Sequence, residues 1–177
     1  MKTLLCTSAC ALALALAAAA QAANPMATAL RNAERMSSSR MTAAAQLMPA
    51  AKYSFKPTAG SMSFGQLILH VATSNDGMCH MLTSYPAAPR TALKPTSPKA
   101  DLVAALKSSW EYCSRALANF TDADLSKPVP FFGGRKVSAA TMVLALSGDW
   151  EDHYSQQAAY LRRNGILPPT AHGRGTP

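Results

Sequence analysis

The stretch that decides the fold is residues 138–165, SAATMVLALSGDWEDHYSQQAAYLRRNG. Its apolar side chains recur at helical spacing, at Met142, Leu146, Trp150 and Leu161. Apolar residues repeated every three or four positions over this length indicate an amphipathic helix. Gly165 suits the position just past a helix C-terminus, and prolines follow it shortly afterwards. We therefore predict a long helix over 138–164 that buries one face.

Three further stretches carry the same period, at residues 25–47, 64–84 and 98–120. Each is preceded by a start signal: Asn24 before Pro25, Ser63 three residues before Gln66, and Ser97 before Pro98. The expected buried positions are, in chain order, Leu30, Met36, Met41, Ala44 and Leu47; Leu67, Val71, Met78 and Leu82; and Leu102, Leu106, Trp110, Cys113, Leu117 and Phe120. The sequence shows no convincing strand alternation. The expected fold is an all-α four-helix bundle.

The N-terminal residues 1–23 read MKTLLCTSACALALALAAAAQAA. One lysine, an uncharged Leu/Ala run and small residues at its end are typical of a cleaved secretory signal peptide. A retained membrane anchor is the alternative, but the run is short and no basic residues follow it directly. We expect a signal peptide at 1–23, a bundle at 24–169 and a flexible tail at 170–177. The mature protein would be exported to the periplasm or beyond, with no membrane span after cleavage.

The charge gives little support to nucleic-acid binding. The chain of 177 residues has a formal net charge of +8, but its basic residues are scattered. Nucleic-acid-binding proteins usually gather charge on one face of a recognisable module, and the sequence shows none. The length also excludes a TIM barrel or a two-domain dinucleotide-binding enzyme.

The chemistry-bearing residues lie on the face of the last predicted helix that should enter the core. His153 projects near the centre of this face, Asp149 lies one turn earlier and Gln157 one turn later, with Tyr160 on the same side. Asp149 and His153 at i, i+4 can point at one atom. With His70 from the edge of the second helix they would form a three-ligand site for zinc or another first-row divalent ion.

Purely structural roles for the same residues remain open. His70 alone can be an ordinary edge histidine. Asp149 and His153 can hydrogen-bond to each other, so that the carboxylate merely orients the imidazole. Of the remaining histidines, His80 and His172 are expected at the surface.

Two cysteines remain outside the predicted signal peptide, Cys79 and Cys113. An even number of cysteines in an exported domain suggests a disulfide. Cys113 belongs to the predicted buried stripe of the third helix, and Cys79 lies on the flank of the second. We therefore predict a Cys79–Cys113 disulfide, with two separate buried thiols as the alternative.

Several blocks of the sequence resemble the DinB-like superfamily. These are DWEDHYSQQAAYLRRNGILPP at 149–169, MPAAKYSFKP at 48–57, SFGQL at 63–67 and HVA at 70–72. Their spacing spans essentially the whole mature chain. The chain looks in particular like a secreted branch in which a cysteine in helix two and a Tyr-Cys pair in helix three recur, here Cys79 and Tyr112-Cys113.

The resemblance implies a bundle with up-down-down-up topology. Many members bind a divalent metal, often zinc or nickel, through one histidine on helix two and an H-x-x-x-H pair on helix four. His70 and His153 match the first and last of these positions. Asp149 stands where the family has its middle histidine, which leaves both a His/Asp/His site and the loss of the metal open.

Two functions from different classes follow. The first is an exported, metal-dependent enzyme of hydrolase or transferase type acting on a small molecule, with His70, Asp149 and His153 as ligands and Gln157 and Tyr160 as outer groups that hydrogen-bond to them. The second is a non-catalytic exported bundle that binds a small ligand or a protein partner and uses the same cluster as a buried hydrogen-bond network. Related bundles often form homodimers, and nothing in the sequence identifies such a face.

Overall fold

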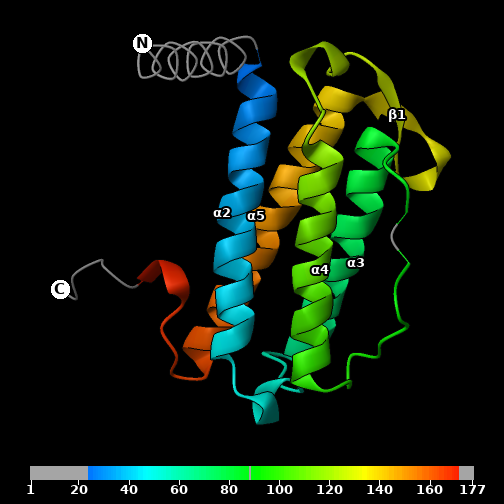
Figure 1. The fold of residues 1–177 in the computed structure, drawn as a ribbon. Coiled ribbons are helices and arrows are strands. Elements are labelled where there is room, and N and C mark those ends of the chain that lie inside the picture. Colours follow the sequence, from blue (N-terminus) through cyan, green and yellow to red (C-terminus); the bar gives the residue numbers. More distant parts are fainter. Residues whose placement is uncertain (1–23, 88, 172–177) are drawn as a thin grey trace, which may run out of the picture.

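The structure is a computed structural model that describes residues 24–87 and 89–171. The helices of the bundle in these residues are α2 (Pro25–Leu47), α3 (Phe64–Thr83), α4 (Lys99–Leu117) and α5 (Ala139–Arg163). α2 and α5 run in one direction and α3 and α4 in the other, so the connection between α3 and α4 crosses the length of the bundle (Figure 1). The predicted all-α bundle with up-down-down-up order is confirmed.

The helix bounds agree closely with the predicted ones except at α4. Its N-cap residue is Pro98 and its last residue is Leu117, so it is shorter at both ends than the stretch 98–120. Ser97 does not cap it, because the Ser97 hydroxyl accepts instead from the backbone N–H of Lys94 at 3.0 Å. α3 begins with the predicted capping box, in which Ser63 and Gln66 bond to each other's backbone N–H groups.

The start of α2 is capped from elsewhere in the chain. The Asp122 carboxylate accepts from the backbone N–H of Met26 at 3.1 Å and of Ala27 at 2.8 Å. The Asn24 side chain, the predicted cap, instead accepts from the backbone N–H of Asp122 at 2.9 Å. A carboxylate at a helix N-terminus also interacts favourably with the helix dipole. This cap therefore joins α2 to the connection between α4 and α5.

The buried face of α2 differs from the predicted stripe. Met36 is 65% exposed and Leu47 is 42% exposed, so their assignment to the core was wrong. Glu34 and Ser37 are buried in the same helix. α2 packs against both α4 and α5, and its buried face is the one between them, where these two polar residues lie.

A polar network ties three helices together inside the core. The Asn75 amide of α3 donates to the Ser109 hydroxyl of α4 at 3.1 Å and accepts from Trp150 Nε1 of α5 at 2.8 Å. Ser109 donates onward to the Leu106 carbonyl at 2.7 Å. Each of these side chains is fully buried, and satisfied polar networks of this kind favour one arrangement of a core.

The predicted disulfide is present between Cys79 of α3 and Cys113 of α4, with 5.5 Å between the Cα atoms. The crossing connection is fixed beside it by Arg90, whose guanidinium donates twice to the Asp76 carboxylate of α3, at 2.6 Å each. Together these contacts join α3 to both α4 and the connection between them.

The connection between α4 and α5 contains a small antiparallel sheet that the sequence analysis did not predict. Strands β1 (Pro128–Pro130) and β2 (Lys136–Ser138) pair with Val129 opposite Val137. Each strand is too short to show alternation, which is why the pattern missed it. The backbone N–H of Ala139 then donates to the Lys127 carbonyl at 2.8 Å, which fixes where α5 begins.

The remaining short elements are the 3₁₀ helices η1 (Ala50–Lys52), η2 (Asp122–Asp124), η3 (Phe132–Gly134) and η4 (Pro169–Ala171). The predicted tail boundary at 169 falls within η4, where the Tyr154 hydroxyl donates to that of Thr170 at 2.9 Å. The predicted signal peptide, 1–23, and residues 172–177 lie outside the described residues. No helix among the described residues is long and apolar enough to cross a membrane.

Candidate metal centre

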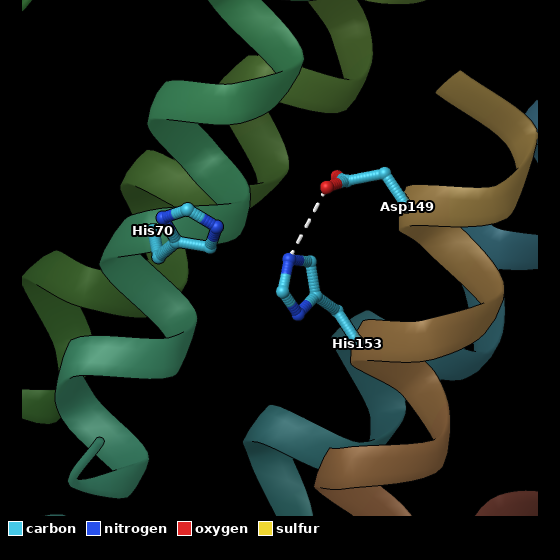
Figure 2. A group of neighbouring side chains, drawn as sticks. All are labelled: His70, Asp149 and His153. Carbon is cyan, nitrogen blue, oxygen red and sulfur yellow. Dashed lines mark ion pairs between the residues drawn. The ribbon is translucent and has the colours of Figure 1, made fainter. Parts of the chain in front are cut away.

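The structure brings His70, Asp149 and His153 together between α3 and α5. Asp149 and His153 lie one turn apart on α5, and both point toward the α3 face that carries His70 (Figure 2). One ligand atom from each residue lies within 4.8 Å of those of the other two. Two atoms that each lie about 2 Å from one zinc ion are at most about 4 Å apart, so a shared ion would require these side chains to move slightly closer together.

The contacts within the group are specific. Nε2 of His153 lies 3.3 Å from Oδ1 of Asp149, the ion pair drawn in Figure 2. The His70 and His153 rings lie edge to face, with 4.7 Å between their centroids and 85° between their planes. The group is thus a compact set of two imidazoles and one carboxylate.

Burial differs sharply across the group. His153 is only 7% exposed, Asp149 is partly buried, and His70 is exposed. The group therefore lies at the edge of the α3–α5 contact, open to solvent on the His70 side. A small molecule could reach it there without passing through the core.

The charge state of His153 reflects its neighbours. The hydrogen bond to Asp149 raises the pKa of His153 above its ordinary 6.5, while burial acts in the opposite direction. Gln156, whose Oε1 lies 3.4 Å from His153 Nδ1, and the Asp152 carboxylate add smaller contributions of the same sign as Asp149. Carboxylate neighbours thus hold this imidazole in place and favour its protonated form.

One oxygen of the group has no protein partner. Asp149 Oδ2 is buried, and no group in the described residues hydrogen-bonds to it. A buried carboxylate oxygen without a partner is costly, so such an atom normally has a hydrogen bond or a cation nearby. The residues present therefore fit a bound cation.

The two predicted outer groups lie farther along α5 and bond elsewhere. The Tyr160 hydroxyl donates to the Met62 carbonyl at 2.6 Å. Gln157 is fully buried, and neither of its amide atoms has a hydrogen-bond partner among the described residues. Their role around the ligands stays a prediction.

Sequence reasoning missed the polar residues on the outer side of His153. Asp152 precedes His153 directly. Gln156 follows His153 by three positions, and this three-residue spacing brings side chains together on a helix. That spacing was the available signal. His80, predicted at the surface, is exposed and bonds through Nδ1 to the Tyr85 carbonyl at 2.7 Å. His172 lies outside the described residues.

Comparisons with known proteins agree on the type of domain. The sequence model of the DinB superfamily matches residues 33–156. A search of curated proteins gives no match.

Solved structures share the fold at low sequence identity. A DinB-like protein from Bacillus subtilis is 23% identical, with a TM-score of 0.65 over 78% of this chain and 94% of that one. A DinB-like protein from Bacillus cereus is 18% identical, with a TM-score of 0.63 over 75% and 89%. A mutant of the mycothiol-dependent maleylpyruvate isomerase is 16% identical, with a TM-score of 0.59 over 73% and 59%. At these identities the likeness concerns the fold alone.

Proposed function

The chain belongs to the DinB superfamily, and from that premise we propose that it is an exported metal-dependent enzyme of hydrolase or transferase type. His70, Asp149 and His153 would hold a divalent ion. The observation that carries this proposal is the buried, unpartnered Asp149 Oδ2 within a compact His/Asp/His group.

The donor set supports zinc or nickel more than calcium or magnesium. Two imidazole nitrogens suit first-row transition metals, whereas calcium and magnesium prefer oxygen ligands throughout. A metal ion at this site would act as a Lewis acid toward an oxygen or sulfur atom of a small-molecule substrate. The exposed side of the group, at His70, is where such a substrate would enter.

The protein's own residues would orient and tune the site. Asp149, itself a proposed ligand, lies 3.3 Å from His153 Nε2, and Gln156 restrains the other ring nitrogen of His153 from outside the ligand set. Outer hydrogen bonds of this kind hold a histidine in one tautomer and one orientation. The buried position of His153 keeps bulk water off one side of the group.

The structural similarity to mycothiol-dependent maleylpyruvate isomerase supports an enzymatic role for this fold. We do not extend the thiol cosubstrate to this chain, because the proposed export would separate it from the low-molecular-weight thiols of the cell interior. The reaction type is therefore proposed only as hydrolase or transferase.

Metal analysis of protein purified without a nickel column tests the site. We expect an equimolar first-row divalent metal and a rise in the melting temperature when zinc or nickel is added to stripped protein. His70→Ala, Asp149→Asn and His153→Ala should each weaken binding by more than about tenfold. His80→Ala is the matched control, an exposed α3 histidine outside the group, and should bind like the wild type.

If stripped protein takes up none of these metals and shows no thermal shift, the metal site is refuted. The second function, a non-catalytic bundle that binds a ligand or partner, then gains support. The 3.3 Å contact between Asp149 and His153 would in that case be part of a buried hydrogen-bond network.

Export is a separate part of the proposal and has its own test. Expression of the full chain in a Gram-negative host should give periplasmic protein whose N-terminus is Asn24. Retention of residues 1–23 on cytoplasmic protein would contradict it. Binding to nucleic acid is not expected, and self-association stays a prediction that ultracentrifugation can measure.

A further inference from the structure

A second candidate site lies under the connection that runs back along the bundle from α3 to α4 (Figure 1). A partly enclosed pocket of about 230 Å³ lies there between this connection and the two helices. α3 contributes Leu69 and Ala72 to its lining, α4 contributes Ala105, and the connection contributes Ala92 and Leu93. The pocket shares no residue with the His/Asp/His group, so it is a separate site.

Contacts on either side of the pocket hold the connection in place. Arg90 donates twice to the Asp76 carboxylate of α3, at 2.6 Å each. Farther along the connection, the Pro95 carbonyl oxygen lies so close to α3 that a Cβ atom at Gly65 would be 2.4 Å from it. Between these two contacts, residues 91–93 make no hydrogen bond within the described part of the chain. The pocket is therefore preformed, as ligand pockets usually are.

The charged and polar side chains of the lining already have partners. Among the described residues that line the pocket, only Asp76 and Arg90 are charged, and both carboxylate oxygens of Asp76 accept from Arg90. Arg90 also bonds to the Ser108 hydroxyl of α4. The Thr73 hydroxyl donates to backbone carbonyl groups of α3. A charged ligand would have to break the Arg90–Asp76 pair or stay unpaired, and both cost free energy.

The rest of the lining is apolar, and its volume limits the size of an occupant. Ala72 is only 4% exposed, and the partly buried Leu69 and Leu93 pack against the hydrophobic core. The walls of an unfilled apolar pocket lack contacts that an apolar molecule of fitting size would supply. An apolar cavity of roughly 150 Å³ holds one benzene molecule. This pocket therefore has room for one ring with a short substituent.

We propose that this pocket binds a small uncharged apolar compound, about the size of one substituted benzene ring. The compound lies between the connection, at Leu93, and the helix walls formed by Ala72 and Ala105. It enters past Thr91 and Ala92, which line the pocket and are exposed. The inference is independent of the metal site and of the enzymatic function proposed above.

Toluene is the probe, because it is uncharged and consists of one ring and one methyl group. The readout is the Ala72 methyl signal in a carbon-13 correlation spectrum of the folded, oxidised protein, assigned by loss of that signal in Ala72→Gly. We expect this signal to shift and saturate below the solubility limit of toluene. The methyl signal of Ala104, an exposed α4 residue outside the lining, should stay in place. Benzylammonium, the same ring with a charge, should give no saturable shift.

Ala105→Leu should abolish the toluene response, because the larger side chain would occupy the pocket from the α4 side. Ala104→Leu is the matched control, the same change at the neighbouring exposed position, and it should respond like the wild type. The proposal is overturned by an absent wild-type response, by equal shifts at Ala72 and Ala104, by an equal response to benzylammonium or by an undiminished response of Ala105→Leu. The probe comparison uses the wild type alone, so it decides the matter even if Ala105→Leu fails to fold.

Discussion

Two carboxyl groups of this protein, those of Glu34 and Asp149, are poorly paired in buried surroundings, with different consequences. Asp149 has one oxygen on His153 and one buried oxygen without a partner, and it raises the pKa of the imidazole. Glu34 has no such neighbour, so its own pKa rises instead, to about 7. Both groups lie on faces that a bundle would normally fill with apolar residues.

The raised pKa of Glu34 predicts a pH-dependent stability. In the unfolded chain this carboxyl group ionises near 4.5, but in the folded protein only near 7. The unfolded state therefore loses its proton first, and the stability falls as the pH rises through this window and stays lower above it. The free energy of unfolding falls by at most about 3 kcal/mol across this window.

Urea unfolding at about pH 5 and about pH 8 measures this effect. Between the two pH values, the free energy of unfolding of the wild type should fall by up to about 3 kcal/mol more than that of Glu34→Gln. Glu111→Gln, an exposed substitution on α4, should keep the wild-type pH dependence. An identical pH dependence of the wild type and Glu34→Gln would contradict the assignment.

At the scale of elements, the start of α3 is fixed by a close backbone contact. The backbone N–H of Gly65 donates to the Tyr53 carbonyl at 2.8 Å. A Cβ atom at Gly65 would lie 2.4 Å from the Pro95 carbonyl oxygen of the crossing connection. Only glycine lets the α2–α3 loop, α3 and this connection pack together here, one helical turn and a half before His70.

Two glycine substitutions in α3 should therefore have opposite effects. Gly65→Ala should destabilise the protein by about 1–3 kcal/mol, because the backbone of the connection must move. Gly77→Ala should stabilise it by about 0.5–1 kcal/mol, because a Cβ atom there meets nothing within 4 Å and alanine is the better helix former. Both are measured by urea unfolding, and equal effects of the two substitutions would refute the role of Gly65.

At the scale of the whole molecule, the parallel helices α3 and α4 are joined by a disulfide and by an ion pair to their connection, in addition to their packing. Their connection crosses the whole length of the bundle, as Figure 1 shows, and leaves the two helices joined by a long segment. The disulfide and the Arg90–Asp76 pair both act on this segment or on the helices that it joins. An oxidised bridge is consistent with the proposed export.

Removal of the disulfide should cost stability. The bridge closes a loop with a sequence separation of 34 residues, for which chain entropy predicts about 3–4 kcal/mol. We expect the double variant Cys79→Ala, Cys113→Ala to unfold at correspondingly lower urea, and reduced wild-type protein to behave like it. Two free thiols in unreduced periplasmic protein, or no change on reduction, would contradict the bridge.

The sequence by itself determined the helices and the residues able to ligate a metal. Helical periodicity is a local property, so the ranges of α2, α3 and α5 and the i, i+4 pair Asp149 and His153 could be predicted from spacing alone. The short strands β1 and β2 could not, since three residues carry no readable period.

Only the tertiary structure decided which faces meet. It placed His70 beside His153, gave the cap of α2 to Asp122 rather than Asn24, and buried Glu34 while leaving Met36 exposed. The physical reason is that a helix between two neighbours buries the side that both of them cover. Which side this is depends on partners distant in the chain, not on the helix's own apolar pattern.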